Sequence, residues 1–197
     1  MHSMRAPCLV LAFAFISSTA AAQGPRASFT PRPQSLPLEE TFAPQRSYAP
    51  TRMLVTDPTG QKTGSVTIDT NRRALYLSLG GGQAIRYGVG VGRAGFEWRG
   101  RAHVGRKAEW PSWTPPAAML KRRPDLPRFM NGGINNPLGA RALYLYNGGR
   151  DTLFRIHGTN EPWTIGQAVS SGCIRMMNDD VMDLYSRVRV GASVRMI

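Results

Sequence analysis

A histidine and a cysteine are the residues of this chain whose types and spacing best suit chemistry. His157 lies sixteen positions before Cys173, and three small residues, Ser170, Ser171 and Gly172, directly precede the cysteine. A thiol becomes a strong nucleophile when a nearby imidazole takes its proton, and the same imidazole can return that proton to a leaving amine. Small residues let a substrate approach the sulfur and leave backbone N–H groups free to bind an oxyanion. Each residue alone is more often structural, so the pair gains its weight from its surroundings.

Two neighbours of the pair are expected to assist it. The imidazole needs an acceptor for its second ring nitrogen, and the backbone carbonyl of Gly158 can supply one. Arg175 would add positive charge near fixed or developing carboxylates. By contrast, we expect His103 to be a surface strand residue and Glu161 to be a solvated loop acid. No spacing of histidine and cysteine predicts a metal site.

The amino-terminal residues predict export through a cleaved signal. A basic residue precedes the apolar run 9–16, which is too short to span a bilayer, and an Ala-x-Ala cleavage site ends at Ala22. Removal of residues 1–22 as a signal peptide would also remove Cys8 and leave Cys173 as the only cysteine. An unpaired thiol in an oxidising compartment favours a reactive role. We therefore expect a protein of the periplasm or cell wall, without a transmembrane segment after cleavage.

The net charge of the chain indicates which classes of partner it can bind. The formal net charge is +13, and such a surface favours anionic partners. An exported protein meets anionic lipid head groups and acidic wall polymers. The sequence contains no basic helix and no aromatic RNA-binding motif, so we expect no nucleic acid partner.

A proline-rich segment separates the signal from the rest of the chain. Residues 23–60 contain seven prolines and few aliphatic side chains. Such a segment buries too little apolar area to offset the entropy of ordering it, so we expect a disordered linker. A short ordered piece is expected near 53–55. The remaining length, 61–197, suits a single catalytic domain with a sizeable core.

The elements that must position the pair are mostly strands. Apolar and alternating runs predict strands at 66–70, 74–79, 84–91 and 193–197. Two further runs, 142–146 and 152–156, flank an Asn-Gly-Gly turn. They predict a hairpin whose second strand ends at His157.

One helix is well marked, after a stretch that is harder to assign. Residues 93–135 show no regular pattern. Asn178 is expected to be the helix N-cap, with two aspartates in the first turn, where the helix dipole favours negative charge. An apolar stripe follows at Val181, Leu184, Tyr185 and Val188. Gly191 is expected to end the helix. Together these elements predict a predominantly β domain with one or two helices.

The segments around the histidine and the cysteine resemble a known active-site signature. The run 157–160 (HGTN), followed by 170–175 (SSGCIR), is similar to that of L,D-transpeptidases with the YkuD-like catalytic domain. The family's first hairpin, its next strand and the loop before its active-site hairpin are matched by 68–77, 87–92 and 136–139. The resemblance covers residues 64–197. It implies a mainly β, YkuD-like fold, a β-sandwich or mixed sheet with one or two short helices (α+β).

The resemblance also implies a specific reaction. Such enzymes cut a peptidoglycan tetrapeptide stem after its third residue, release the terminal D-alanine and hold the stem as a thioester, here on Cys173. An amine, commonly from another stem, then attacks. His157 maps onto the family's base, and Gly158 onto the residue whose carbonyl orients it. The residues expected to bind substrate or the oxyanion are Ser170, Ser171, Gly172 and Arg175. Peptidoglycan stem peptides are the expected partners, and no metal or organic cofactor is required.

One position departs from the family pattern. The resemblance also leaves open which molecule accepts the acyl group. The commonest pattern has histidine directly before Gly-Cys, where this chain has Ser171, which would donate a hydrogen bond instead. The same acyl-enzyme could anchor an outer-membrane protein to the wall, exchange the terminal D-amino acid or hydrolyse stems. A non-enzymatic wall-binding module with a vestigial Cys–His pair is the alternative from another class.

Overall fold

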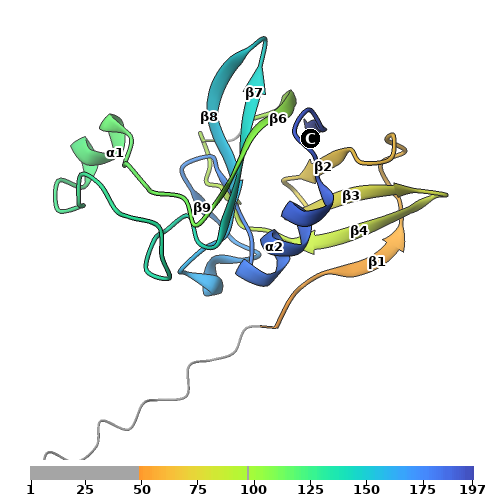
Figure 1. Ribbon diagram of the computed structural model, residues 1–197, viewed down its shortest axis with the longest axis horizontal. Coiled ribbons are helices and arrows are strands. Elements are labelled where there is room, and N and C mark those ends of the chain that lie inside the picture. The colour runs from red at the N-terminus through yellow and green to blue at the C-terminus, as the bar shows by residue number, and fades with distance from the viewer. Residues whose placement is uncertain (1–48, 97) are drawn as a thin grey trace, which may run out of the picture. The chain divides into compact units, whose positions relative to one another are not determined.

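Strands are the predominant regular elements in the part of the chain that the computed structural model describes, which is residues 49–96 and 98–197 (Figure 1). The signal peptide expected at 1–22 lies outside these residues, as does the part of the expected linker before residue 49. The described strands are β1 (Met53–Thr56), β2 (Val66–Asp69), β3 (Ala74–Gly80), β4 (Gln83–Gly88), β5 (Val91–Gly92), β6 (Gly100–Glu109), β7 (Arg141–Asn147), β8 (Arg150–His157), β9 (Ala168–Ser170), β10 (Ile174–Arg175) and β11 (Ser193–Met196). The helices are α1 (Ala117–Arg122), the 3-10 helix η1 (Pro162–Thr164) and α2 (Asn178–Arg187).

Nine of the described strands join in one sheet, in the order β1-β4-β3-β2-β11-β6-β7-β8-β10, while β5 and β9 form a small parallel pair. Strand β11 runs parallel to β2 and antiparallel to β6, so the last strand in the sequence lies inside the sheet. Strand β10 runs parallel to β8. This mixed sheet, with its two short α-helices, confirms the expected mainly β, α+β fold.

Strands β1 to β4 form one half of the sheet, in which short turns connect β2 to β3 and β3 to β4. Many of the apolar side chains of β2 to β4 are buried, among them Val66, Ile68, Leu75 and Leu77, whereas Met53 and Leu54 of β1 are exposed. Gly81 and Gly82 make the turn from β3 to β4 and, like Gly80 at the end of β3, have a positive φ, where a side chain would be strained. Strand β1 pairs with β4 and coincides with the ordered piece expected near 53–55, inside the segment expected to be a linker.

Strands β6, β7, β8 and β10 form the other half of the sheet. The predicted hairpin is confirmed as β7 and β8, with Ala142 opposite His157. His103 lies in β6, as expected, and is half-buried. The connection from β6 to β7, which contains α1, extends away from the sheet (Figure 1). A single bridge between Trp113 and Met130 ties it together, and this sparse pairing accounts for the lack of a regular pattern in the sequence.

Helix α2 contacts both halves of the sheet. Its buried side chains Val181 and Leu184 belong to the same apolar cluster as β7 and β8. The hydroxyl of Tyr87, from β4, donates a hydrogen bond of 2.6 Å to Asp183 of the helix. The helix therefore links the strands that come first in the sequence to those that hold the site.

The ends of α2 differ from expectation. Met177 is the N-cap residue, and Asn178 is the first helical residue, because its side chain bonds to strand ends instead of to the helix. The helix ends at Arg187, several residues before Gly191. Neither α2 nor any other helix within the described residues is long and apolar enough to cross a bilayer.

Candidate active site

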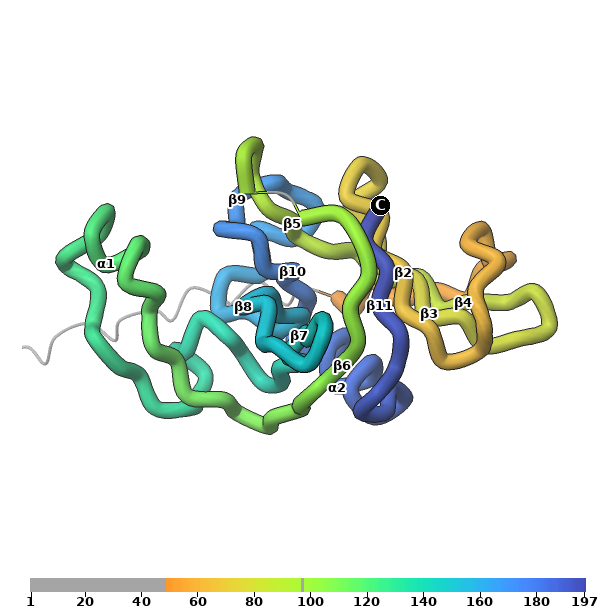
Figure 2. Tube along the Cα trace, turned by 90° about the horizontal axis from the view of Figure 1, so that it is seen from above, coloured from red at the N-terminus to blue at the C-terminus, as the bar shows by residue number. Residues whose placement is uncertain are grey.

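Parallel pairing of β8 and β10 places the histidine and the cysteine on adjacent segments of chain, two register positions apart. His157 is the last residue of β8, and Cys173 directly precedes β10. Arg175 lies opposite His157 in the register of these strands, which places Cys173, two residues earlier, level with Arg155. Side chains two positions apart on a strand point to the same face, so Arg155 and His157 face the same way. Figure 2 shows β10 between β8 and the β5–β9 pair.

The imidazole of His157 is buried and held in one orientation. His157 is 4% exposed, and its Nδ1 is 2.6 Å from the carbonyl oxygen of Gly158. A carbonyl can only accept, so Nδ1 carries the proton and Nε2 keeps its lone pair. Burial lowers the pKa of His157 to about 4, and the charges of Arg175 and Arg155 act in the same direction against the Gly158 hydrogen bond. The imidazole is therefore neutral at pH 7 and able to accept a proton.

The thiol of Cys173 is half-buried and is the one free cysteine in the described part of the chain. Its Sγ lies 3.9 Å from the carbonyl oxygen of Leu153. Within the described residues, no hydrogen bond joins this Sγ to the imidazole of His157. Desolvation raises the pKa of Cys173, although the backbone N–H of Arg155 and the charges of Arg155 and Arg175 oppose this effect. Both groups consequently rest in their neutral forms at pH 7.

A bulge in β8 presents the carbonyl that the thiol contacts. The pairing of β7 with β8 shifts register between Tyr144 and Tyr146, and Leu153 adopts a φ of 63°. That conformation is strained for a leucine, by roughly 1–2 kcal/mol. Asp151 holds it, because its carboxylate accepts a hydrogen bond of 2.8 Å from the backbone N–H of Leu153. The Leu153 side chain is 71% exposed beside the cysteine.

The serine–serine–glycine turn before the cysteine is braced from within. The hydroxyl of Ser170 donates to the carbonyl of Cys173 at 2.6 Å and accepts from the N–H of Gly172 at 3.1 Å. The N–H of Gly172 is therefore occupied, where a free donor had been expected. A Cβ at Gly172 would lie 2.5 Å from the ring of Phe154, so only glycine fits there. Ser171 is half-buried and is the more accessible of the two serines.

Arg175 is paired with an acid that the sequence did not connect to it. Its Nη1 lies 2.6 Å from a carboxylate oxygen of Glu161 and 3.4 Å from the hydroxyl of Thr164. Glu161 was expected to be a solvated loop acid and is instead half of an ion pair, because the parallel pairing of β10 brings the two residues together. The pair ties the connection between β8 and β9 to the strand that follows the cysteine.

Three residues missed by sequence reasoning line the neighbouring strands. The ring of Tyr144 lies between two guanidinium groups, with Arg106 3.5 Å and Arg155 4.4 Å from its centroid. Arg155 is also held by a carboxylate, with its Nη1 and Nη2 atoms 2.7 and 2.9 Å from Asp151. These contacts fix a positive charge beside the thiol. They depend on strand register, so no local pattern in the sequence could have indicated them.

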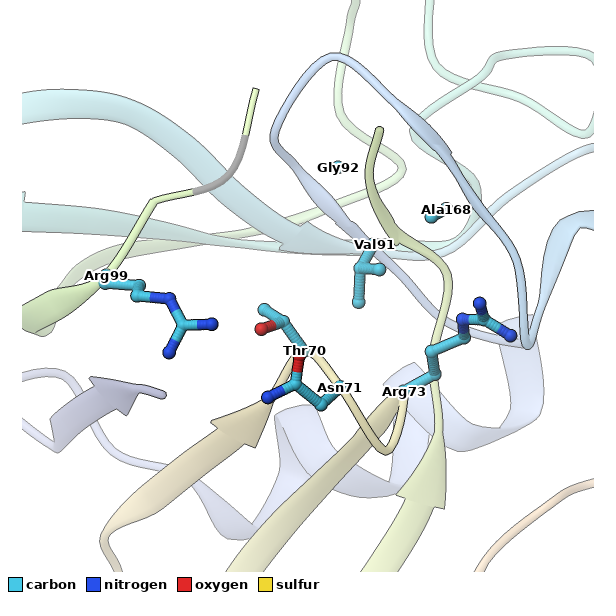
Figure 3. A pocket seen from close by; sticks show the side chains of 7 residues that line it. All are labelled: Thr70, Asn71, Arg73, Val91, Gly92, Arg99 and Ala168. Carbon is cyan, nitrogen blue, oxygen red and sulfur yellow. The ribbon is translucent and has the colours of Figure 1, made fainter. Parts of the chain in front are cut away.

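A cavity of about 570 Å³ opens near the site but does not include the histidine or the cysteine (Figure 3). Its lining consists of Thr70, Asn71, Arg73, Val91, Gly92, Arg99 and Ala168. Gly92 connects the two places, because a Cβ there would come within 3.1 Å of the Cα of Gly172. Figure 3 shows the guanidinium of Arg99 pointing toward Thr70 and Asn71. The lining makes this cavity polar and basic.

Comparison with known proteins agrees with this geometry. The model of the YkuD family, an L,D-transpeptidase catalytic domain, matches residues 63–196. The "Probable L,D-transpeptidase ErfK/SrfK" of Escherichia coli K12 is 36% identical, and the match covers 80% of this chain and 58% of that protein. The chain thus spans little more than half the length of that relative.

Two solved structures resemble the chain as well. A Brucella melitensis protein, named a probable carnitine operon oxidoreductase, is 44% identical over 78% of this chain and 96% of its own, with a TM-score of 0.50. L,D-transpeptidase 3 from Mycobacterium tuberculosis shares the fold at 15% identity, over 68% of this chain and 60% of its own, with a TM-score of 0.51. Because the family model spans nearly all of the described residues, the chain belongs to the YkuD family of L,D-transpeptidase catalytic domains.

Proposed function

We propose that this protein is an L,D-transpeptidase that carries a peptidoglycan tetrapeptide stem on Cys173 and transfers it to an amine. In the first step, the sulfur forms a bond to the carbonyl carbon of the third stem residue. The bond from that carbon to the nitrogen of D-alanine breaks. The thiol proton passes through Nε2 of His157 to the leaving amine. In the second step, an acceptor amine attacks the thioester, and its proton returns through the same nitrogen to the sulfur.

The single observation that carries this proposal is the state of the imidazole. It is buried, its Nδ1 is bound to the carbonyl of Gly158, and it lies on the strand beside the cysteine. A neutral thiol and a neutral imidazole transfer the proton during attack, and the positive charges of Arg155 and Arg175 favour the negative charge that develops. Gly158 thus acts through its carbonyl, and Ser171 is the proposed hydrogen-bond donor to substrate.

The proposed location follows from the expected signal peptide and the charge. A full sequence with a net charge of +13 leaves a strongly basic protein after removal of the expected signal peptide, and such a protein would bind acidic wall polymers readily, which suits an enzyme of cell-wall biogenesis and cell shape in the periplasm or wall. The acceptor is the open part of the proposal. Anchoring of an outer-membrane protein, exchange of D-amino acids and hydrolysis of stems all use the same acyl-enzyme.

The test is to incubate the purified protein with a disaccharide-tetrapeptide and measure its intact mass. The expected adduct is the stem without its terminal D-alanine, and it should be absent from Cys173→Ala. A dimer product indicates cross-linking, a tripeptide product indicates hydrolysis, and an exchanged stem after addition of a D-amino acid indicates exchange. A folded wild-type protein with a titratable thiol but no adduct would support the wall-binding module instead.

A further inference from the structure

The side-chain amide of Asn178, at the start of α2, makes three hydrogen bonds to strand ends. Its Oδ1 accepts from the backbone N–H of Ala140 at 3.0 Å and of Thr159 at 3.2 Å, while its Nδ2 donates to the carbonyl of Thr159 at 3.0 Å. Two donors and one acceptor face the amide, so only this orientation satisfies all three contacts. The residue is thus committed to the segment that follows His157.

The peptide unit between Gly158 and Thr159 connects this amide to the imidazole. The N–H of that unit belongs to Thr159 and bonds to Asn178, whereas its C=O belongs to Gly158 and accepts from Nδ1 of His157. A peptide unit is planar and rigid, so the directions of its N–H and C=O are fixed relative to each other. Any rotation of the unit that broke the bond to Asn178 would also turn the carbonyl away from the imidazole.

The main chain on either side of this peptide unit is held differently. The carbonyl of His157 accepts from the N–H of Met176 at 2.8 Å, and the N–H of Gly158 donates to the carbonyl of Arg141 at 3.0 Å. Both are backbone contacts of the kind that neighbouring strands provide. The peptide unit that orients the imidazole is held instead by one side chain, that of Asn178.

The two glycines beside the amide leave it the room that it needs. A Cβ at Gly139 or at Gly158 would overlap Oδ1 of Asn178. Gly139 also has a φ of 62°, which a residue with a side chain would adopt only with strain. The loop before β7 and the end of β8 therefore meet around this carboxamide.

We propose that Asn178 is a positioning residue for His157, and that it acts through the Gly158–Thr159 peptide unit. It holds the carbonyl that fixes the proton on Nδ1, and thereby keeps Nε2 free to take the proton of Cys173. Hydrogen bonds in such a chain polarise one another, which strengthens the hold on the imidazole. The role of the freed Nε2 rests on the proposed function, but the choice of tautomer does not.

The tautomer can be measured directly by long-range proton–nitrogen NMR of the histidine rings in the full chain. The three histidines are distinguished with His103→Gln and His157→Gln variants. Wild-type His157 should show its proton on Nδ1 at neutral pH. Asn178→Ala should give a mixture of tautomers at His157, because the carbonyl of Gly158 is no longer fixed.

A kinetic test uses the rate at which a carbapenem acylates Cys173, followed by intact mass against pH. Asn178→Ala should lower this rate by about 10- to 100-fold, as loss of a group that orients a catalytic histidine does elsewhere. Asn178→Asp keeps an oxygen acceptor and should recover most of the rate at pH 8.

The pH profile separates positioning from a merely structural role. The charged groups that act on His157 are Arg155 and Arg175, both positive, and Arg175 is paired with Glu161. A carboxylate in Asn178→Asp would favour the protonated imidazole, so the acid limb of the acylation rate should move to higher pH. A structural role alone would lower the melting temperature without moving that limb.

Asn160→Ala is the matched control, because within the described residues its amide bonds to the carbonyl of Asn135, in the connection from β6 to β7, and not to the Gly158–Thr159 peptide unit. In this variant, the tautomer of His157 and the acylation rate of Cys173 should match those of the wild type. A single Nδ1 tautomer and an unchanged rate in Asn178→Ala would overturn the proposal, as would an equal loss in Asn160→Ala. If wild-type protein is not acylated at all, the proposed function fails, and the NMR result still decides the role of Asn178.

Discussion

Both halves of the sheet share one apolar core, and they differ in the polar contacts that the second half adds to it. In β2 and β3, apolar side chains such as Leu75 and Leu77 are fully buried, and short turns connect the strands. Around β8 and β10, the decisive contacts are polar: a carbonyl on an imidazole, a carboxamide on a peptide and a carboxylate on a guanidinium. Apolar packing gives stability without direction, whereas hydrogen bonds fix the direction of a group. Substitutions in the apolar core of the first half should therefore change stability, whereas substitutions of the polar groups around β8 and β10 should change reactivity.

The largest expected effect is on reactivity. His157→Ala removes both the base and the later acid, so acylation of Cys173 by a carbapenem should slow by about 10²- to 10⁴-fold. Circular dichroism should show an intact fold. His103→Ala, in β6, is the control and should react at the wild-type rate. Near-normal acylation of His157→Ala would contradict the assignment of the base, and it would show that polar groups of the second half do not control reactivity.

The next effect tests the other half. Leu77→Ala leaves a cavity in the apolar core, so the free energy of unfolding should fall by about 2–5 kcal/mol. Urea denaturation measures the change. The acylation rate of the folded fraction should stay that of the wild type. A variant that kept its stability but lost reactivity would show that the two halves are not separable in this way.

Acid should weaken the protein through the buried histidine. The folded chain keeps His157 neutral down to about pH 4, while the unfolded chain protonates it near 6.5. The contribution of His157 to the free energy of unfolding is therefore fully present above pH 6.5. It falls by about 3 kcal/mol as the pH falls toward 4. Denaturation of wild type and His157→Gln at pH 7 and pH 4.5 should show a smaller loss in the variant. Equal losses would mean that other groups carry the acid sensitivity.

The smallest expected effect concerns the bulge beside the thiol. Leu153→Asn places a residue that tolerates positive φ where leucine is strained, so the free energy of unfolding should rise by about 0.5–1 kcal/mol. The change buries no new surface, because the leucine side chain is exposed. A loss of stability on urea denaturation would indicate that Leu153 packs against something under working conditions.

The sequence predicted the strands better than the contacts between them at the site, for a physical reason. The strands at 66–69 and 74–80 and the hairpin of β7 and β8 are marked by local alternation and by turn residues. The His157–Cys173 pair was also visible, because its residue types and small neighbours lie close together in the sequence. What local pattern could not supply is register, and it was register that joined Arg155 to Tyr144 and Glu161 to Arg175.

Asn178 illustrates the same limit in a single residue. Asparagine before a helix with acidic residues in its first turn is a good N-cap signal, and the prediction followed it. The strand ends that approach the helix compete for the same amide and offer it three partners at once. A tertiary contact therefore overrides the local preference, and the residue serves the histidine instead of its own helix.

The place of β11 has a consequence for the order of folding. Strands β2 and β6 both pair with β11, which follows every other strand in the sequence. A chain that emerges from its amino end cannot complete this sheet until that strand is present. Assembly thus waits for the latest segment to arrive, and such long-range closure is slow. Under the proposed export across a membrane, this delay would keep the proposed nucleophile, Cys173, in an unassembled site until transit is complete.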